Sequence, residues 1–201
     1  MRLFHLSDLH IGKRVNEFSM IEDQKYILER ILDLAEKEMP DGVILAGDIY
    51  DKQIPSAEAV QVFDEFITKL AERKFPVFVI SGNHDSAERL AFGGRLLNSR
   101  GIYLSPVYDG TVMKIPIADQ YGTVWIHLLP FIRPAAVRRV FEDESDLITD
   151  VQSAVRAVIS HMEIDPNERN ILVAHQFVTG ASRCESEDIQ VGGLDNIDAS
   201  V

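Results

Sequence analysis

The chain has 201 residues, of which 46% are hydrophobic and 26% are charged, a balance that favours a packed globular domain over global disorder. The single cysteine, Cys184, excludes an intramolecular disulfide framework and a cysteine-rich zinc site, and no apolar run approaches the ~18 residues that cross a bilayer. The net charge of −12 excludes nucleic-acid binding by bulk positive charge, so local groups would have to attract a polyanion. We expect a cytoplasmic protein without membrane contacts.

Strands and helices alternate through the first half of the chain. Short apolar runs predict a strand at residues 2–6 and buried strands at residues 42–47 and 76–80. Apolar residues at helical spacing predict helices at residues 19–38, 56–73 and 85–99. Each helix has a candidate N-terminal cap. Ser19 with Glu22 and Asp85 with Glu88 have the spacing of capping boxes for the first and third helices, and Ser56 can cap the second.

The second half of the chain has a different pattern. Residues 102–130 predict short strands, of which 124–129 is the clearest. A helix is predicted from Thr149 to Met162, where Thr149 and Gln152 can form the helix start. A buried strand is predicted from Asn170 to Ala174. The acidic stretch 142–146 is interpreted as a solvated loop. The whole pattern predicts an α/β fold, a two-sheet sandwich flanked by helices.

Six polar side chains follow the predicted strands. They are Asp8, His10, Asp48, Asn83, His84 and His175. Because side chains just past the carboxyl ends of strands converge on one edge of an open α/β sheet, we expect these six to share a neighbourhood. Their types are those that bind hard or borderline divalent cations.

The spacing of these residues suggests a pair of metal ions. An extended backbone would direct Asp8 and His10 the same way, so that both bind a first ion together with Asp48. Asp48 is the natural bridge to a second ion, which Asn83 and His175 would complete. The mixture of oxygen and imidazole ligands suits manganese, with iron, zinc and magnesium as alternatives.

His84 adjoins Asn83 and should project elsewhere. We interpret it as the residue that contacts the scissile phosphate, either protonating the leaving oxygen or stabilising charge. Asp51 and Asp85 are equally good candidates for orienting its ring. The remaining histidines are expected to be packed or next to the metal ligands (His5), structural (His127) and solvated (His161).

The ordered motifs resemble the calcineurin-like metallophosphoesterase superfamily. They are Asp8-x-His10, Gly47-Asp48, Gly82-Asn83-His84-Asp85 and His175. Within it, the stretches 6–13, 46–51, 80–86, 174–178 and 191–193 resemble the bacterial SbcD branch of DNA-repair nucleases. The likeness covers the whole chain, residues 1–201.

This resemblance implies a metallophosphoesterase-type sandwich and a manganese-dependent nuclease. Its substrates would be DNA ends and hairpins, cut 3′ to 5′ on duplexes and endonucleolytically on hairpins or single strands. Its partners would be an SbcC-type coiled-coil ATPase and a second copy of the chain. The homodimer would form through the helices at 56–73 and 86–99, with Leu90, Phe92, Leu96 and Leu97 as apolar contributors.

One departure from the family matters for the metal site. The Gly-His-x-His motif expected after His175 does not occur between His175 and Val201. The sequence therefore resembles only the N-terminal nuclease domain of the family, without the capping domain and the partner-binding segment. Each ion would lack one imidazole ligand, so we expect weaker metal binding and low or lost nuclease activity for these 201 residues.

Lys13 and Arg14 follow the first metal motif and are candidates for contacts with substrate phosphates. Two other functions remain open at this point. One is a small-molecule phosphodiesterase or a phosphatase with the same metal residues, and the other is a non-catalytic scaffold with the same fold. The six polar residues after the strands argue against the scaffold.

Overall fold

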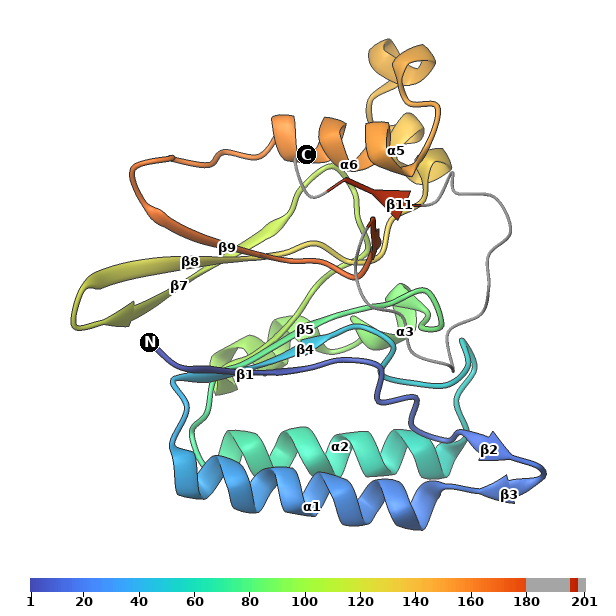
Figure 1. Ribbon diagram of the computed structural model, residues 1–201, viewed down its shortest axis with the longest axis vertical. Coiled ribbons are helices and arrows are strands. Elements are labelled where there is room, and N and C mark those ends of the chain that lie inside the picture. The colour runs from blue at the N-terminus through green and yellow to red at the C-terminus, as the bar shows by residue number, and fades with distance from the viewer. Residues whose placement is uncertain (180–195, 199–201) are drawn as a thin grey trace.

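The computed structural model describes residues 1–179 and 196–198. Its elements form four layers (Figure 1): a pair of long helices, two stacked sheets and a second pair of helices. Cys184 and the run 191–193 lie outside the described residues. The two-sheet sandwich flanked by helices that the sequence predicts is confirmed.

The first sheet is parallel and has the strand order β1-β4-β5-β6. Its strands are β1 (Leu3–Leu6), β4 (Gly42–Ala46), β5 (Val77–Ile80) and β6 (Ile102–Leu104). Every residue of β4 and β5 is buried, because both faces of the sheet are covered. The second sheet has the order β7-β8-β9, with strands β7 (Met113–Asp119), β8 (Gly122–Leu128) and β9 (Arg169–Val173).

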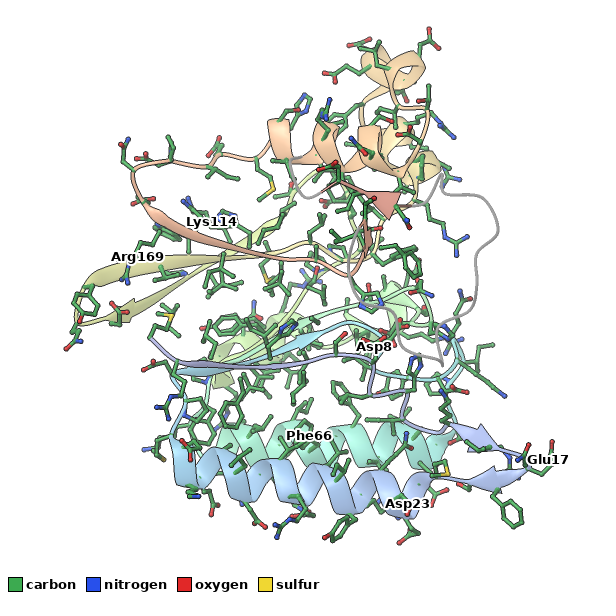
Figure 2. The ribbon with its side chains drawn as sticks, viewed as in Figure 1. Asp8, Glu17, Asp23, Phe66, Lys114 and Arg169 are labelled. Carbon is green, nitrogen blue, oxygen red and sulfur yellow. The ribbon has the colours of Figure 1, made fainter. Side chains whose placement is uncertain are left out.

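Side chains of β4 point alternately to the two faces of the first sheet and so join the layers. Val43 and Leu45 pack towards the helices α1 (Ile21–Glu38) and α2 (Ala57–Glu72), where Phe66 fills the interface (Figure 2). Ile44 and Ala46 point to the other face and pack against the second sheet. One strand thus contributes to two cores and holds the carboxyl end of the sheet in a fixed place.

The second pair of helices packs on the outer side of β7-β8-β9 through a third apolar cluster. They are α5 (Pro134–Val140), which the sequence pattern did not predict, and α6 (Val151–Ser160). The remaining elements are short: β2 (Arg14–Val15), β3 (Phe18–Ser19), α3 (Ala87–Leu90), α4 (Gly94–Leu97), η1 (Asn98–Arg100), η2 (Glu142–Leu147), β10 (Phe177–Val178) and β11 (Asn196–Ile197). None of the helices in this described part combines the length and apolar content that crossing a bilayer requires.

Three predicted helix starts need correction. The α1 helix has Met20 rather than Ser19 at its N-cap, because Ser19 pairs with Arg14 in the β2–β3 hairpin. The Ser19 hydroxyl still accepts a hydrogen bond from the N–H of Ile21 at 3.4 Å. The cap of α6 lies one residue later than predicted, where Asp150 and Ser153 form a reciprocal capping box. The predicted cap of α2 is confirmed, since the Ser56 hydroxyl accepts a hydrogen bond from the backbone N–H of Ala59.

The third helix start that needs correction is that of the helix predicted at residues 85–99. In the structure this segment is divided into the short helices α3, α4 and η1. Gly93 adopts a left-handed backbone with φ of 76°, which glycine tolerates and which interrupts the helix. Ser86, rather than Asp85, caps α3.

The structure also places the three histidines outside the candidate site. His5 was expected to be packed or next to the metal ligands, but it is exposed on the edge strand β1. His127 is buried and His161 is exposed, as predicted.

Candidate metal centre

The candidate site lies where four strands end. Asp8 and Asp48 follow β1 and β4, His84 follows β5, and His175 follows β9 of the second sheet. Since β1, β4 and β5 are parallel neighbours, their carboxyl ends meet at one edge, where Figure 2 shows Asp8. The stacked sheets bring the end of β9 to the same place.

Asp48 is the centre of this cluster. Its Oδ2 atom lies 3.5 Å from Nε2 of His175, 3.8 Å from Nε2 of His10 and 3.9 Å from Nε2 of His84. Its other oxygen, Oδ1, accepts a hydrogen bond of 2.9 Å from the backbone N–H of His84. Only 3% of Asp48 is exposed, so this carboxylate faces the histidines rather than solvent.

The ligand-type atoms form two groups that share Asp48. One contains His10, Asp48 and His84, and the other contains Asp8, Asp48 and His175, with the atoms of each group within 4.8 Å of one another. The sequence pattern instead places His10 with Asp8 and gives His84 no ligand role. Asn83, which it assigns to the second ion, is half-buried, and no hydrogen bond holds its amide among the described residues.

Two of the histidine rings are held by backbone carbonyls. Nδ1 of His175 donates to the carbonyl oxygen of Ala46 at 2.7 Å, and Nδ1 of His84 donates to that of Asp51 at 3.2 Å. These contacts place the hydrogen of a neutral ring on Nδ1 and leave Nε2 with a lone pair on the side of Asp48. Of the two candidates for orienting His84, it is thus Asp51 that contacts the ring, through its main chain.

The electrostatics of the site suit a cation. Burial opposes ionisation of Asp48, but the contact with His175 and the N–H of His84 outweigh it and hold the pKa of Asp48 below its usual value. Burial lowers the pKa of His10. Burial also disfavours the charged form of His175, but Asp48 attracts that form and raises the pKa of His175 overall. The donors thus include an ionised carboxylate and a neutral imidazole, the forms that bind metals.

Glycines allow the close approach of these loops. A Cβ atom on Gly82 would lie 2.0 Å from Oδ1 of Asp48, and one on Gly47 would lie 2.6 Å from the ring of His175. Gly47 also has a φ of 92°, in the left-handed region. Any other side chain at either position would displace a predicted metal ligand.

The backbone of the ligands themselves differs from the prediction. Asp8, His10 and Asp48 have φ values of 57°, 43° and 49°, so all three are left-handed. The extended backbone expected for Asp8 and His10 is therefore wrong, although Nε2 of His10 still lies 3.8 Å from Oδ1 of Asp8. Such conformations are uncommon for residues other than glycine and cluster at functional sites.

Asp85 has a role that the sequence patterns did not reveal. Its buried carboxylate accepts hydrogen bonds from the backbone N–H groups of Ile49, Tyr50 and Gly82, at 3.1, 2.9 and 2.9 Å. Burial raises the pKa of Asp85 against the effect of these three donors. The side chain therefore ties the loop after β4 to the loop after β5. From the sequence alone, the position of Asp85 before a predicted helix indicates a helix cap and not this tertiary contact.

The predicted phosphate-binding residues lie beside the cluster rather than in it. Lys13 is half-buried, and Arg14 is exposed on β2, where its guanidinium donates to the carbonyl of Glu17 at the hairpin tip (Figure 2). Gln24 of α1 was not singled out from the sequence, yet its side chain hydrogen-bonds to the loop that carries His10. A glutamine in the first turn of an amphipathic helix carries no motif that could have revealed this contact.

Comparisons with known proteins identify the family of the chain. The family model described as calcineurin-like phosphoesterase matches residues 1–193. A protein of Staphylococcus saprophyticus, named as the SbcD component of the nuclease SbcCD, is 33% identical over 205 residues, which cover 100% of this chain and 53% of that protein. One of Staphylococcus epidermidis with the same name is 34% identical over 202 residues, covering 98% of this chain and 52% of that protein. The chain thus spans about half the length of these curated relatives.

Proposed function

Because the chain belongs to the calcineurin-like phosphoesterase family, we propose that it is the nuclease domain of a metal-dependent enzyme that hydrolyses phosphodiester bonds in DNA. One observation carries the proposal: three histidine Nε2 atoms surround one buried carboxylate at an edge where loops from both sheets meet. The similarity to proteins named as components of the nuclease SbcCD supports DNA as the substrate.

The residues of the cluster fit a pair of divalent ions. Asp8, His10, Asp48 and His175 would hold them, with Asp48 shared, and Asn83 would add an amide oxygen. We propose manganese, because the set mixes carboxylate oxygens with imidazole nitrogens. When bound, the ions would polarise the phosphodiester and make a water molecule more acidic.

His84 is the proposed catalytic residue. Its side chain is 43% exposed, so a substrate can reach Nε2 while the Asp51 carbonyl fixes Nδ1. The doubly protonated ring would donate from Nε2 to the leaving oxygen, which would otherwise depart as an unstable alkoxide. Nε2 of His84 lies 3.9 Å from Oδ2 of Asp48, so the proton donor would stand next to the proposed ions.

Lys13 and Arg14 would supply phosphate contacts beside the metal centre. They follow His10 closely in the chain, and the Arg14 side chain is exposed. With a net charge of −12, DNA binding must rest on such local positive groups, on the bound ions and on a partner. We propose that this partner is an SbcC-type coiled-coil ATPase, since the named relatives are components of SbcCD.

We also propose a homodimer that contacts through α3 and α4. Phe92 and Leu96 in this region are 87% and 80% exposed, the highest values among the large hydrophobic residues that the structure describes. Leu90 is 6% exposed and Leu97 packs on the first core, so these two residues are not part of the proposed contact. The apolar pair Phe92 and Leu96 would be covered by the same pair of a second copy.

A substrate comparison tests the proposed nuclease activity. The protein is incubated with Mn²⁺ and linear duplex DNA, a DNA hairpin, a cyclic nucleotide or an aryl phosphate, with Asp48→Asn as the control variant. We expect weak Mn²⁺-dependent cleavage of DNA that Asp48→Asn lacks, in line with the low activity expected when each ion has one imidazole ligand fewer. Hydrolysis of only the small substrates would favour a small-molecule phosphodiesterase or phosphatase. Tight Mn²⁺ binding without hydrolysis of any substrate would favour a non-catalytic scaffold.

A further inference from the structure

The loop between β1 and β2 carries two ligands of the proposed centre, Asp8 and His10, in left-handed backbone conformations. Such conformations persist only where the surrounding structure holds them from several sides. On one side, the loop after β4 does so: the N–H groups of Asp8, His10 and Ile11 donate to the carbonyls at positions 47, 48 and 49, at 3.1, 2.9 and 2.9 Å.

On the other side, the side chain of Gln24 holds the loop. Oε1 of Gln24 accepts a hydrogen bond from the N–H of Gly12 at 2.9 Å. Nε2 of Gln24 donates to the carbonyl oxygens of Leu9 at 3.1 Å and His10 at 2.8 Å. The half-buried amide thus spans the loop from residue 9 to residue 12 and joins it to the first turn of α1.

His10 needs this support more than the other histidines do. His84 and His175 are each oriented by a carbonyl that accepts from Nδ1. Nδ1 of His10 is buried and has no hydrogen-bond partner among the described residues, and the nearest carboxylate oxygen, Oδ1 of Asp51, is 3.9 Å away. The direction of the His10 ring therefore depends on its backbone and on packing, which includes an edge-to-face contact with the His84 ring at 4.8 Å, rather than on a hydrogen bond to Nδ1.

We infer that Gln24 is a positioning residue for the metal centre: it fixes the backbone of the loop and thereby aims Nε2 of His10 at the ion shared with Asp48. This inference rests on the proposed metal centre and extends it to a residue outside the recognised motifs. Gln24 belongs to neither group of ligand-type residues around Asp48. It acts through the loop, as outer partners of metal ligands do when they orient those ligands.

The test compares Gln24→Met, which keeps the length and helix propensity of the side chain but removes its hydrogen bonds, with Gln61→Met on the exposed surface of α2. Circular dichroism identifies a temperature at which both variants are folded. There, we expect Mn²⁺ affinity measured by calorimetry to fall about tenfold or more in Gln24→Met and to stay at the wild-type value in Gln61→Met. A purely structural role would lower the melting temperature but leave the affinity of the folded protein unchanged.

A second readout needs no metal. In ¹⁵N-histidine spectra of the metal-free protein, Gln24→Met should shift or broaden the ring signals of His10 and leave those of His127 and His161 unchanged. Gln24→Asn, whose amide is too short to reach the loop, should act in the same way if Gln24→Met is poorly folded. Wild-type affinity together with an unchanged His10 signal in either folded variant would overturn the inference. Absence of Mn²⁺ binding by the wild type would instead contradict the metal centre. The ring signal of His10 would in that case still test whether Gln24 fixes the conformation of the loop.

Discussion

At the scale of single residues, the site depends on where each imidazole carries its hydrogen. Nδ1 of His84 and Nδ1 of His175 donate to carbonyl oxygens, so both rings turn Nε2 towards Asp48. The two rings nevertheless differ in access, because the His84 side chain is 43% exposed and that of His175 is 15% exposed. This difference is why we assign proton transfer to His84 and metal binding to His175.

Substitution of His84 tests this division of roles. We expect His84→Ser to lower DNA hydrolysis by about 100-fold or more, because the leaving oxygen loses its proton donor. Bound manganese, measured by metal analysis after dialysis, should change little, and His161→Ser should leave both activity and metal content unchanged. A loss of bound manganese in His84→Ser would make His84 a ligand, as its grouping with His10 and Asp48 allows.

Gly82 provides a second residue-scale prediction. We expect Gly82→Ala to lower Mn²⁺ affinity and to destabilise the fold by about 1–3 kcal/mol, because the new Cβ atom would overlap Oδ1 and the backbone nitrogen of Asp48. Gly94→Ala is the matched control, since its Cβ atom would meet Leu104 at an ordinary 3.4 Å. Calorimetry and denaturant unfolding measure both effects. Wild-type affinity and stability in Gly82→Ala would show that the two loops can separate without loss.

At the scale of elements, the strands were the most predictable part of the fold. The runs at 42–47 and 76–80 are apolar at every position, as strands covered on both faces must be, and their ends locate Asp48 and His84. The loops after them were not predictable, because their shape depends on contacts between distant segments. Asp85 illustrates this: the local pattern favours a helix cap, but its carboxylate binds the loop after β4 instead.

The second sheet offers an element-scale prediction. Arg169 at the start of β9 binds Asp119 at the end of β7 through two hydrogen bonds, of 3.1 and 2.7 Å, and the amino terminus of Met1 lies 3.2 Å from the same carboxylate. The Arg169 guanidinium and the N–H of Tyr121 hold the pKa of Asp119 well below its ordinary value of 3.8.

A folded-state pKa below the ordinary value has a defined consequence for stability. The stabilisation by Asp119 is fully present above pH 3.8 and is lost as the pH falls through the lower, folded-state pKa. We therefore expect Asp119→Asn to melt at a lower temperature than the wild type at pH 7 and the difference to shrink below pH 4. Asp143→Asn, in the exposed acidic stretch, serves as the control. A difference in melting temperature that is constant from pH 7 to pH 3 would contradict this origin.

At the scale of the whole molecule, the surface of α3 and α4 predicts self-association. We expect light scattering to give the mass of a dimer for the wild type and of a monomer for the double variant Phe92→Ser, Leu96→Ser, because the substitutions remove the exposed apolar pair. Leu147→Ser, which changes a residue on η2 that is 74% exposed, should remain dimeric. A monomeric wild type, or a dimeric double variant, would contradict the proposed contact.

The central claim is that loops from both sheets assemble one metal centre around Asp48. Anomalous diffraction at the manganese absorption edge, from crystals grown with Mn²⁺, tests this most directly. We predict two anomalous peaks on either side of the Asp48 carboxylate, with Asp8, His10 and His175 in coordination contact, and neither peak in Asp48→Asn. Crystals with manganese bound elsewhere, or with no peak beside Asp48, would contradict the account.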